Sequence, residues 1–240
     1  MLDPRALLEQ FLGADAAKAM GQPGGSLTQQ AQNMTGGSFT KGAVVGGVLG
    51  LLLGGKKVRK LAGGMLGYGG AAAAGAMAYK AYDNWQKGNA VATAPTVTRA
   101  DVGHVDERFL PEFAPAANGQ PFQLALITAM IGAAKADGHI DAKEQRVLFE
   151  KVEQLGLDAE SKAFVFDALT RPVDIAQIAA AARGMEQATE LYLISRLAID
   201  PDHPAERAYL QALGHKLELP AELVAHLDHQ VESAESPASE

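Results

Sequence analysis

Acidic side chains gather in two short stretches of the C-terminal half of the sequence. The first is AKADGHIDAKE (134–144) and the second is AIDPDHPAE (198–206). Together they supply six candidate ligands for a metal ion: Asp137, Asp141, Glu144, Asp200, Asp202 and Glu206. Carboxylates that converge repel one another, and carboxylate oxygens are the ligands that Ca²⁺ and Mg²⁺ prefer. The two stretches are therefore a candidate site for a divalent cation, calcium or magnesium.

Helix capping explains much of the same pattern without a ligand. Asp141 and Glu144 have the spacing of a capping box, in which each side chain accepts a hydrogen bond from an amide at the start of a helix. His203 and Pro204 suit the start of a second helix. An EF-hand calcium loop is excluded, because Lys135 stands where that loop needs a carboxylate. Capping alone and cation binding are both kept as interpretations.

An internal repeat connects the two acidic stretches. Residues 144–160 align without gaps on residues 206–222, and Asp137 aligns on Asp200 when the second copy is one residue shorter. A repeat of this length is typical of one supersecondary unit used twice. We therefore expect two helix–acidic-turn–helix units that face each other.

The C-terminal region, residues 121–232, has the periodicity of helices throughout. Apolar residues recur three and four positions apart, and no alternating strand pattern occurs. Glycine and proline divide the region into about seven helices with short connections. These breaks fall at 136–138, Gly156, 171–172, Gly184, 201–204 and Pro220. The sequence predicts an all-α fold followed by a short tail, 233–240.

The N-terminal stretch, residues 1–20, predicts a short amphipathic helix. Asp3 can cap this helix and Pro4 suits its first turn. Four apolar residues share one face: Leu7, Leu8, Phe11 and Leu12. We expect a helix that packs on the rest of the protein, with a membrane-surface or partner-binding helix as the alternative. Residues 21–41 are rich in Gly, Ser and Gln and predict a flexible linker.

A Gly/Ala-rich segment, residues 42–82, predicts helices that associate with a membrane. It contains two apolar runs, GAVVGGVLGLLLGG (42–55) and LAGGMLGYGGAAAAGAMAY (61–79). Glycines at helical spacing make a bare ridge on which another helix can pack: Gly42, Gly46, Gly50, Gly54, Gly63, Gly67 and Gly75. Glycine is a poor helix former in water, but in lipid the backbone has no other hydrogen-bond partner. The ridges also predict a homo-oligomer.

The direction of membrane crossing depends on which apolar run spans the bilayer. The second run has 19 residues, enough for a core of about 30 Å, whereas the first is too short by itself. The basic residues of KKVRK (56–60) should stay in the cytoplasm. The C-terminal half is then outside if only 61–79 crosses, and inside if 42–55 crosses. Residues 83–120 show no sustained period and predict a linker.

Charge and motif content exclude several classes of function. Residues 121–240 carry 10 Lys and Arg against 20 Asp and Glu, which argues against nucleic acid as a partner. The chain has no cysteine, so thiolate chemistry is excluded. No nucleophile triad, zinc-protease motif or phosphate-binding loop occurs, so we do not expect an enzyme. His226 and His229 are expected on a solvated helix face.

Two motifs together resemble known bacterial families. KADGHIDAKE, followed by an amphipathic helix and a weaker acidic second copy, resembles the TerB-type helical domain of tellurite-resistance proteins. GGVLGLLLGGKKVRK and YGGAAAAGAMAYKAYDNWQ resemble the YebE-type family of inner-membrane proteins, whose function is uncharacterised. The resemblance implies a seven-helix TerB-like domain, a location in the bacterial inner membrane with a lean toward a cytoplasmic C-terminal domain, and a metal-binding role for Asp137, Asp141 and Glu144.

We therefore expect a membrane-anchored TerB-like binding or scaffold module with a protein partner, which senses or binds a divalent cation through its acidic turn. A metal-dependent enzyme that activates water with the same carboxylates is the alternative from another class. A glycine-zipper oligomer that acts on the membrane is a third.

Overall fold

The computed structural model describes residues 2–12, 70–98, 100–110, 114–136, 158–199 and 201–235. Within these ranges the protein is helical and contains no strand, so the expected all-α fold is confirmed. The α-helices are α1 (Pro4–Leu12), α6 (Gly70–Gln86), α7 (Phe122–Ala134), α9 (Ala159–Thr170), α10 (Ile175–Ala180), α11 (Gly184–Ala198), α12 (Pro204–Lys216) and α13 (Ala221–Glu235). Three 3-10 turns follow α6: η2 (Val91–Thr93), η3 (Asp101–Gly103) and η4 (Glu107–Phe109).

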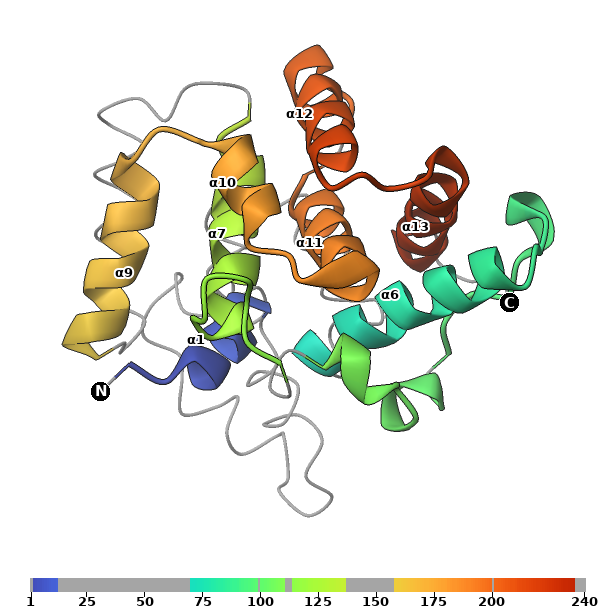
Figure 1. Ribbon diagram of the computed structural model, residues 1–240, viewed down its shortest axis with the longest axis horizontal. Coiled ribbons are helices and arrows are strands. Elements are labelled where there is room, and N and C mark those ends of the chain that lie inside the picture. The colour runs from blue at the N-terminus through green and yellow to red at the C-terminus, as the bar shows by residue number, and fades with distance from the viewer. Residues whose placement is uncertain are drawn as a thin grey trace, which may run out of the picture.

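Helix α11 is the centre of the bundle. Every residue from 187 to 199 is buried. Helix α7 lies beside α11, while α6, α12 and α13 pack on its other sides (Figure 1). A helix that is covered all round must be apolar or have its polar groups satisfied inside the protein. The buried hydroxyl of Ser195 accordingly donates to the carbonyl oxygen of Leu191 at 2.8 Å.

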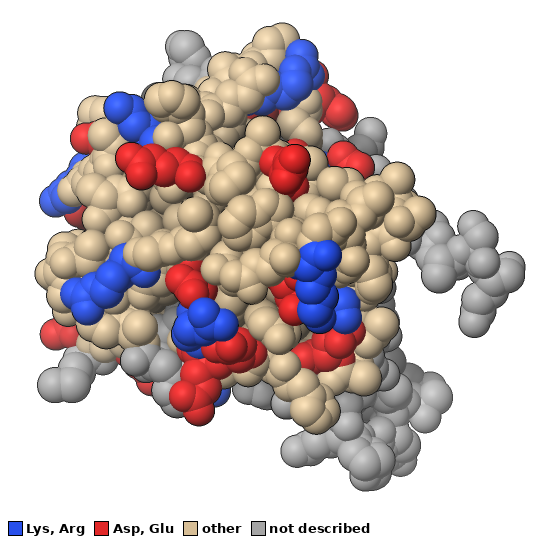
Figure 2. Space-filling view, turned by 45° about the vertical axis from the view of Figure 1, so that its right-hand side comes forward, with Lys and Arg blue, Asp and Glu red and all other residues tan. Residues whose placement is uncertain are grey.

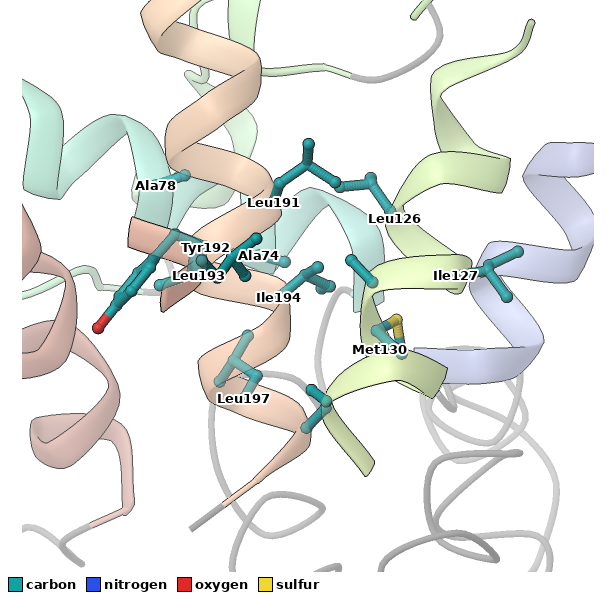
Figure 3. Close-up of a cluster of buried hydrophobic side chains, with 14 of the residues drawn as sticks. Ala74, Ala78, Leu126, Ile127, Met130, Leu191, Tyr192, Leu193, Ile194 and Leu197 are labelled. Carbon is teal, nitrogen blue, oxygen red and sulfur yellow. The ribbon is translucent and has the colours of Figure 1, made fainter. Parts of the chain in front are cut away.

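The core between α7 and α11 consists of large aliphatic side chains. Leu126 of α7 lies near Leu191 of α11 (Figure 3), and both are at most 4% exposed. Met130 and Ile194 are buried in the same cluster. Each such side chain contributes roughly 1.5–3 kcal/mol when it leaves water. The contact between α7 and α11 therefore supplies much of the stability of the bundle.

The repeat is visible in the positions of the helices. Helix α9 begins at Ala159 and α13 begins at Ala221, and these two residues correspond in the aligned copies. Ile131 and Ile194 also correspond, and both are buried in the α7–α11 contact. Helices α7 and α11 are thus equivalent members of the two units. The stretch 137–157, which holds the first acidic turn, lies outside the described residues.

The helix starts follow the expected capping chemistry. Asp3 accepts hydrogen bonds from the amides of Arg5 and Ala6 at the start of α1. Asp158 accepts from the amides of Glu160 and Ser161 at the start of α9. Each side chain satisfies amides that have no partner within their own helix. The prediction of a capped amphipathic helix at the N-terminus is confirmed.

Helix α6 differs from the expected membrane span. Residues 70–79 belong to the second apolar run, yet Ala73, Met77 and Ala81 of α6 are fully buried in the protein core. The helix packs against α11, α13 and α1. Its small side chains allow this close approach, because interiors are packed without gaps. Within the described ranges, no helix combines the length and apolarity needed to cross a bilayer.

Gly75, one of the predicted ridge glycines, makes a close backbone contact inside the protein. A Cβ atom at this position would overlap the carbonyl oxygen of Phe109 in η4. The absence of a side chain therefore lets α6 touch the backbone of η4. The other six ridge glycines, Gly42, Gly46, Gly50, Gly54, Gly63 and Gly67, lie outside the described residues.

The expected linker 83–120 is in part a structural component of the bundle. Ala94, Val97, Phe109 and Ala116 are at most 6% exposed. Asn84 and Gln230 both donate to the carbonyl oxygen of Pro95, at 2.8 and 3.0 Å. Isolated apolar residues between 3-10 turns have no period, so the sequence pattern did not reveal their burial. The bundle therefore begins before residue 121 and includes α6.

Candidate functional site

Of the first acidic stretch (134–144), the structure describes only residues 134–136, which include Lys135. The three candidate ligands Asp137, Asp141 and Glu144 lie outside the described residues. The ammonium group of Lys135 donates to the carbonyl oxygens of Leu169 at 2.7 Å and Arg171 at 2.5 Å. These are orphan carbonyls at the C-terminal end of α9, where a positive charge is favourable. Burial lowers the pKa of Lys135. The lysine of the acidic motif thus caps a neighbouring helix.

The second acidic turn is held by helix capping. His203 accepts a hydrogen bond from the amide of Ala205 at 3.3 Å, and Pro204 is the first residue of α12. The capping interpretation is confirmed for this turn. Arg207 donates to the carbonyl oxygens of Pro201 and Asp202, at 2.7 and 2.8 Å.

A bound cation is disfavoured at the second turn by this arginine. The guanidinium group of Arg207 places a permanent positive charge on the backbone that a cation would have to approach. Asp202 is exposed and Glu206 is partly buried in the first turn of α12, while Asp200 lies outside the described residues. Across the parts of the chain that the structure describes, no three His, Cys, Asp or Glu side chains are grouped to hold a metal ion.

A groove of about 360 Å³ lies between α7, α9 and α10. Its walls combine polar side chains with apolar ones, and the apolar ones include Leu124, Phe164, Val173 and Ile178. Val173, at 36% exposure, is the exposed large hydrophobic residue of the described chain. Concave surfaces with apolar walls and a few polar groups are the usual sites of ligand binding. The sequence analysis missed this groove, because its lining comes from α7, α9 and α10, which no sequence motif connects.

Polar groups surround the groove without giving it a strong charge. Asn118, Gln120 and Gln177 contribute amide side chains to its lining. Arg171 pairs with Asp167 at 2.8 Å, so the two charges largely compensate each other. Asp174 accepts from the amide of Gln177 and caps α10. The lining therefore offers hydrogen bonds and apolar contact more than an ionic attraction.

A partly buried polar cluster between α11 and α13 was also missed by the sequence analysis. The Tyr192 hydroxyl donates to Asp228 at 3.2 Å, and Arg196 Nε lies 3.6 Å from the same carboxylate oxygen. Burial is the main cause that raises the pKa of Tyr192 and of Asp228. Tyr192 therefore stays protonated and serves as a donor, so the cluster positions α13 against α11. These residues are far apart in sequence and match no motif.

The histidines of α13 are not on a solvated face, and that expectation is wrong. His226 is 2% exposed, and His229 Nε2 lies 3.3 Å from the carbonyl oxygen of Ala94. Gln230 is buried beside them and accepts from the amide of Val97 at 2.9 Å. This face of α13 receives residues 94–97, whose burial has no periodic signal in the sequence.

Comparison with known proteins gives the family. A family model described as "Protein of unknown function (DUF533)" matches residues 38–231, which is most of the chain. The chain belongs to the DUF533 family. The matched range contains the acidic motif, the glycine-rich segment and all of the described bundle except α1 and the last turn of α13.

One curated relative of this DUF533 protein is the "Uncharacterized protein in ampR 5'region" of Yersinia enterocolitica. It is 37% identical over 98 residues, which cover 41% of this chain and 70% of the relative. No solved structure matches the chain.

Proposed function

We propose that this DUF533 protein is a membrane-anchored, TerB-like binding and scaffold module of the bacterial inner membrane. The observation that carries the proposal is the groove between α7, α9 and α10, with its apolar walls and its lining of amide side chains. The described residues bring together no cluster of nucleophile, base and acid beside this groove. Binding is therefore a better account of the geometry than catalysis.

The partner that best fits the groove is a short segment of another protein. Amide side chains such as Gln120 and Gln177 can donate to and accept from a peptide backbone. Leu124, Phe164 and Ile178 can enclose one or two small apolar side chains of that segment. We propose no nucleic-acid partner, because residues 121–240 carry 10 Lys and Arg against 20 Asp and Glu. On the face shown in Figure 2 the basic side chains are interspersed with acidic ones.

With residues 70–79 packed in the bundle, the part of the Gly/Ala-rich segment that we propose as the membrane anchor is 42–69, in which the run 42–55 would need its flanking residues to cross the bilayer. This stretch holds the uncharged run 42–55 and the basic residues 56–60. Its glycine ridges favour helix–helix contact in lipid, and we propose that they join copies of the chain. The resemblance to YebE-type proteins favours a bundle on the cytoplasmic side.

A second candidate function is binding of a divalent cation at the first acidic turn. The specific observation in its favour is that the ammonium group of Lys135 is directed to the carbonyl oxygens at the end of α9. Lys135 is therefore occupied, and it does not need to face Asp137, Asp141 and Glu144. If Ca²⁺ or Mg²⁺ binds only the native state, it should raise the melting temperature of the chain.

The groove is tested by site-specific photo-crosslinking in intact cells. A photoreactive amino acid at Val173 should give a crosslinked product of discrete mass. Ala125→Trp, which fills the groove, should abolish that product. A crosslinker at Ala176, which is exposed on α10 but does not line the groove, is the matched control and should give none. Equal products at both positions, or a product that survives Ala125→Trp, would contradict groove binding.

A further inference from the structure

Helices α9 and α13 are equivalent members of the repeat and turn the same face to the core. They lie on opposite sides of the bundle (Figure 1) and begin at the corresponding residues Ala159 and Ala221. Counted from these starts, three buried residues of α9 fall on three buried residues of α13: Ser161, Val165 and Leu169 on Leu223, Leu227 and Val231. All six are at most 4% exposed. The remaining faces of the two helices can therefore be compared residue by residue.

On α13, the face beside this buried stripe holds an extended segment of the same chain, residues 94–97. Gln230 binds it with both ends of its amide: Nε2 donates to the carbonyl oxygen of Pro95 at 3.0 Å, and Oε1 accepts from the amide of Val97 at 2.9 Å. His229 Nε2 lies 3.3 Å from the carbonyl oxygen of Ala94. Ala94 has φ −64° and ψ 133°, which is the polyproline II region favoured before a proline.

On α9, the corresponding face lines the groove between α7, α9 and α10. Counted from the helix starts, three residues of α9 fall on the face of α13 that holds the segment: Phe164 on His226, Asp167 on His229 and Ala168 on Gln230. All three residues of α9 line the groove. The α9 wall of the groove is therefore the counterpart of a surface that binds an extended, proline-containing segment.

The α7 wall of the groove shows the same relationship. Because Ile131 of α7 corresponds to Ile194 of α11, the groove residue Leu124 corresponds to Gln187. Gln187 Nε2 donates to the carbonyl oxygen of Pro115 at 3.2 Å. Both walls of the groove are thus counterparts of surfaces that hold an alanine–proline segment in the second unit.

The chemistry of the groove suits a segment of this kind. Its volume of about 360 Å³ is at the small end of ligand pockets, so it admits a few extended residues more readily than a helix about 10–12 Å across. Asp167 pairs with Arg171 and Asp174 caps α10, so both carboxylates of the lining are engaged. The amides of Gln120 and Gln177 supply N–H donors. Proline offers a carbonyl oxygen and no N–H, so it needs donors and not acceptors.

We propose that the groove binds an extended, proline-containing segment of a partner protein. This inference rests on the proposed function of the groove and specifies the chemistry of its partner. The proline ring packs on Phe164 and Val173, while neighbouring carbonyl oxygens accept hydrogen bonds from Gln120 and Gln177. Segments in the polyproline II conformation are preformed in solution, so they lose little entropy when they bind a groove with an aromatic wall.

The first test measures binding of a labelled peptide to the purified full chain by fluorescence anisotropy. The peptide has the sequence of residues 92–98, ATAPTVT, and replacement of its proline by alanine should weaken binding at least fivefold. Gln177→Ala should also weaken binding at least fivefold, because it removes a donor. Gln211→Ala, at an exposed glutamine of α12 outside the groove, is the matched control and should bind as the unchanged chain. Ala125→Trp should abolish binding.

Two results of this measurement would overturn the inference. One is equal affinity for the peptides with and without proline. The other is unchanged affinity in Gln177→Ala, which decides the question even if Ala125→Trp fails to fold.

The second test identifies the residues that crosslink to Val173 in cells and separates this inference from the proposed function. Mass spectrometry should place the crosslink within three residues of a proline in another protein. A groove-specific crosslink far from any proline, or one to a second copy of this chain, overturns the inference and leaves the groove a binding site. If no groove-specific product forms, the proposed function fails and this inference fails with it.

Discussion

Three glycines that are buried in helices of the described residues, Gly75, Gly132 and Gly214, form a series that tests the packing of α6. A Cβ atom at Gly75 would overlap the backbone carbonyl of Phe109, which belongs to a different element and is fixed by the 3-10 turn. At Gly132 the nearest atoms are side-chain ends, Ile178 Cδ1 at 2.9 Å and the Tyr209 hydroxyl at 3.1 Å. At Gly214 the nearest atom is Tyr192 Cε2 at 3.4 Å, an ordinary contact.

These close contacts predict how replacement of each glycine by alanine changes the free energy of unfolding. Alanine gains about 1 kcal/mol over glycine in a helix interior at all three positions. Overpacking against a neighbour costs typically 1–3 kcal/mol and more where the backbone must shift. Gly75→Ala should therefore destabilise the protein by about 1–2 kcal/mol net. Gly132→Ala should be near neutral, because rotamers of two side chains can adjust. Gly214→Ala should stabilise by up to about 1 kcal/mol.

The assay is urea unfolding of the full chain, followed by circular dichroism at 222 nm. If the slope of the free energy of unfolding against urea concentration is the same in all three variants, a change in the midpoint concentration reports a change in stability. The reasoning is refuted if Gly75→Ala is as stable as the unchanged chain while Gly214→Ala shows its gain. That result would mean that α6 does not touch η4, and Gly75 would again be available as a position of a membrane ridge.

Three further predictions concern the cap of α9, the extent of the bundle and the pH dependence of stability. Lys135→Met should destabilise the protein by about 1–2 kcal/mol, since it removes charged hydrogen bonds to the partly buried carbonyl oxygen of Leu169 and the exposed one of Arg171, and should speed amide exchange in α9 more than in α11. Deletion of residues 42–69 should release a folded chain from the membrane fraction, whereas deletion of 42–82 should unfold it by removing α6; a folded 42–82 deletion would contradict the assignment of α6 to the core. Because burial raises the pKa of Asp228, its contribution to stability is complete below the unfolded pKa of about 3.9 and is lost as pH rises through the folded pKa. As pH rises above about 4, the free energy of unfolding of Asp228→Asn should therefore fall less than that of the unchanged chain. If urea unfolding gives both proteins the same dependence of this free energy on pH, the prediction is refuted.

Local signals predicted the helices well. Asp3 and His203 cap the starts of their helices through hydrogen bonds to amides two or three residues later. Such contacts can be predicted from the residue types at neighbouring positions. The repeat also predicted two equivalent helix–turn–helix units, and α7 and α11 stand at equivalent positions of the two copies. In the described part of the candidate site, the capping role of His203 and Pro204 could be read from their types alone.

Predictions that needed knowledge of distant neighbours were less accurate. Residues 70–79 are apolar and rich in glycine and alanine, and this composition suits a lipid environment and a tightly packed protein core equally well. Likewise, the ammonium group of Lys135 could not be placed from sequence, because its acceptors are the carbonyl oxygens of Ala168, Leu169 and Arg171 at the end of α9. The α7–α9–α10 groove brings together segments that no motif connects.

The sequence by itself determined that the protein is all helical, that its C-terminal region is built on a repeat, and that its N-terminal residues form an amphipathic helix. These features follow from hydrogen bonds and periodicity within a few residues. Only the tertiary structure decided that α6 is a core helix, that Gly75 serves a contact with η4, and that Tyr192, Arg196 and Asp228 meet. The physical reason is that burial and close approach are properties of surfaces that come together, and those surfaces are made by residues distant in the chain.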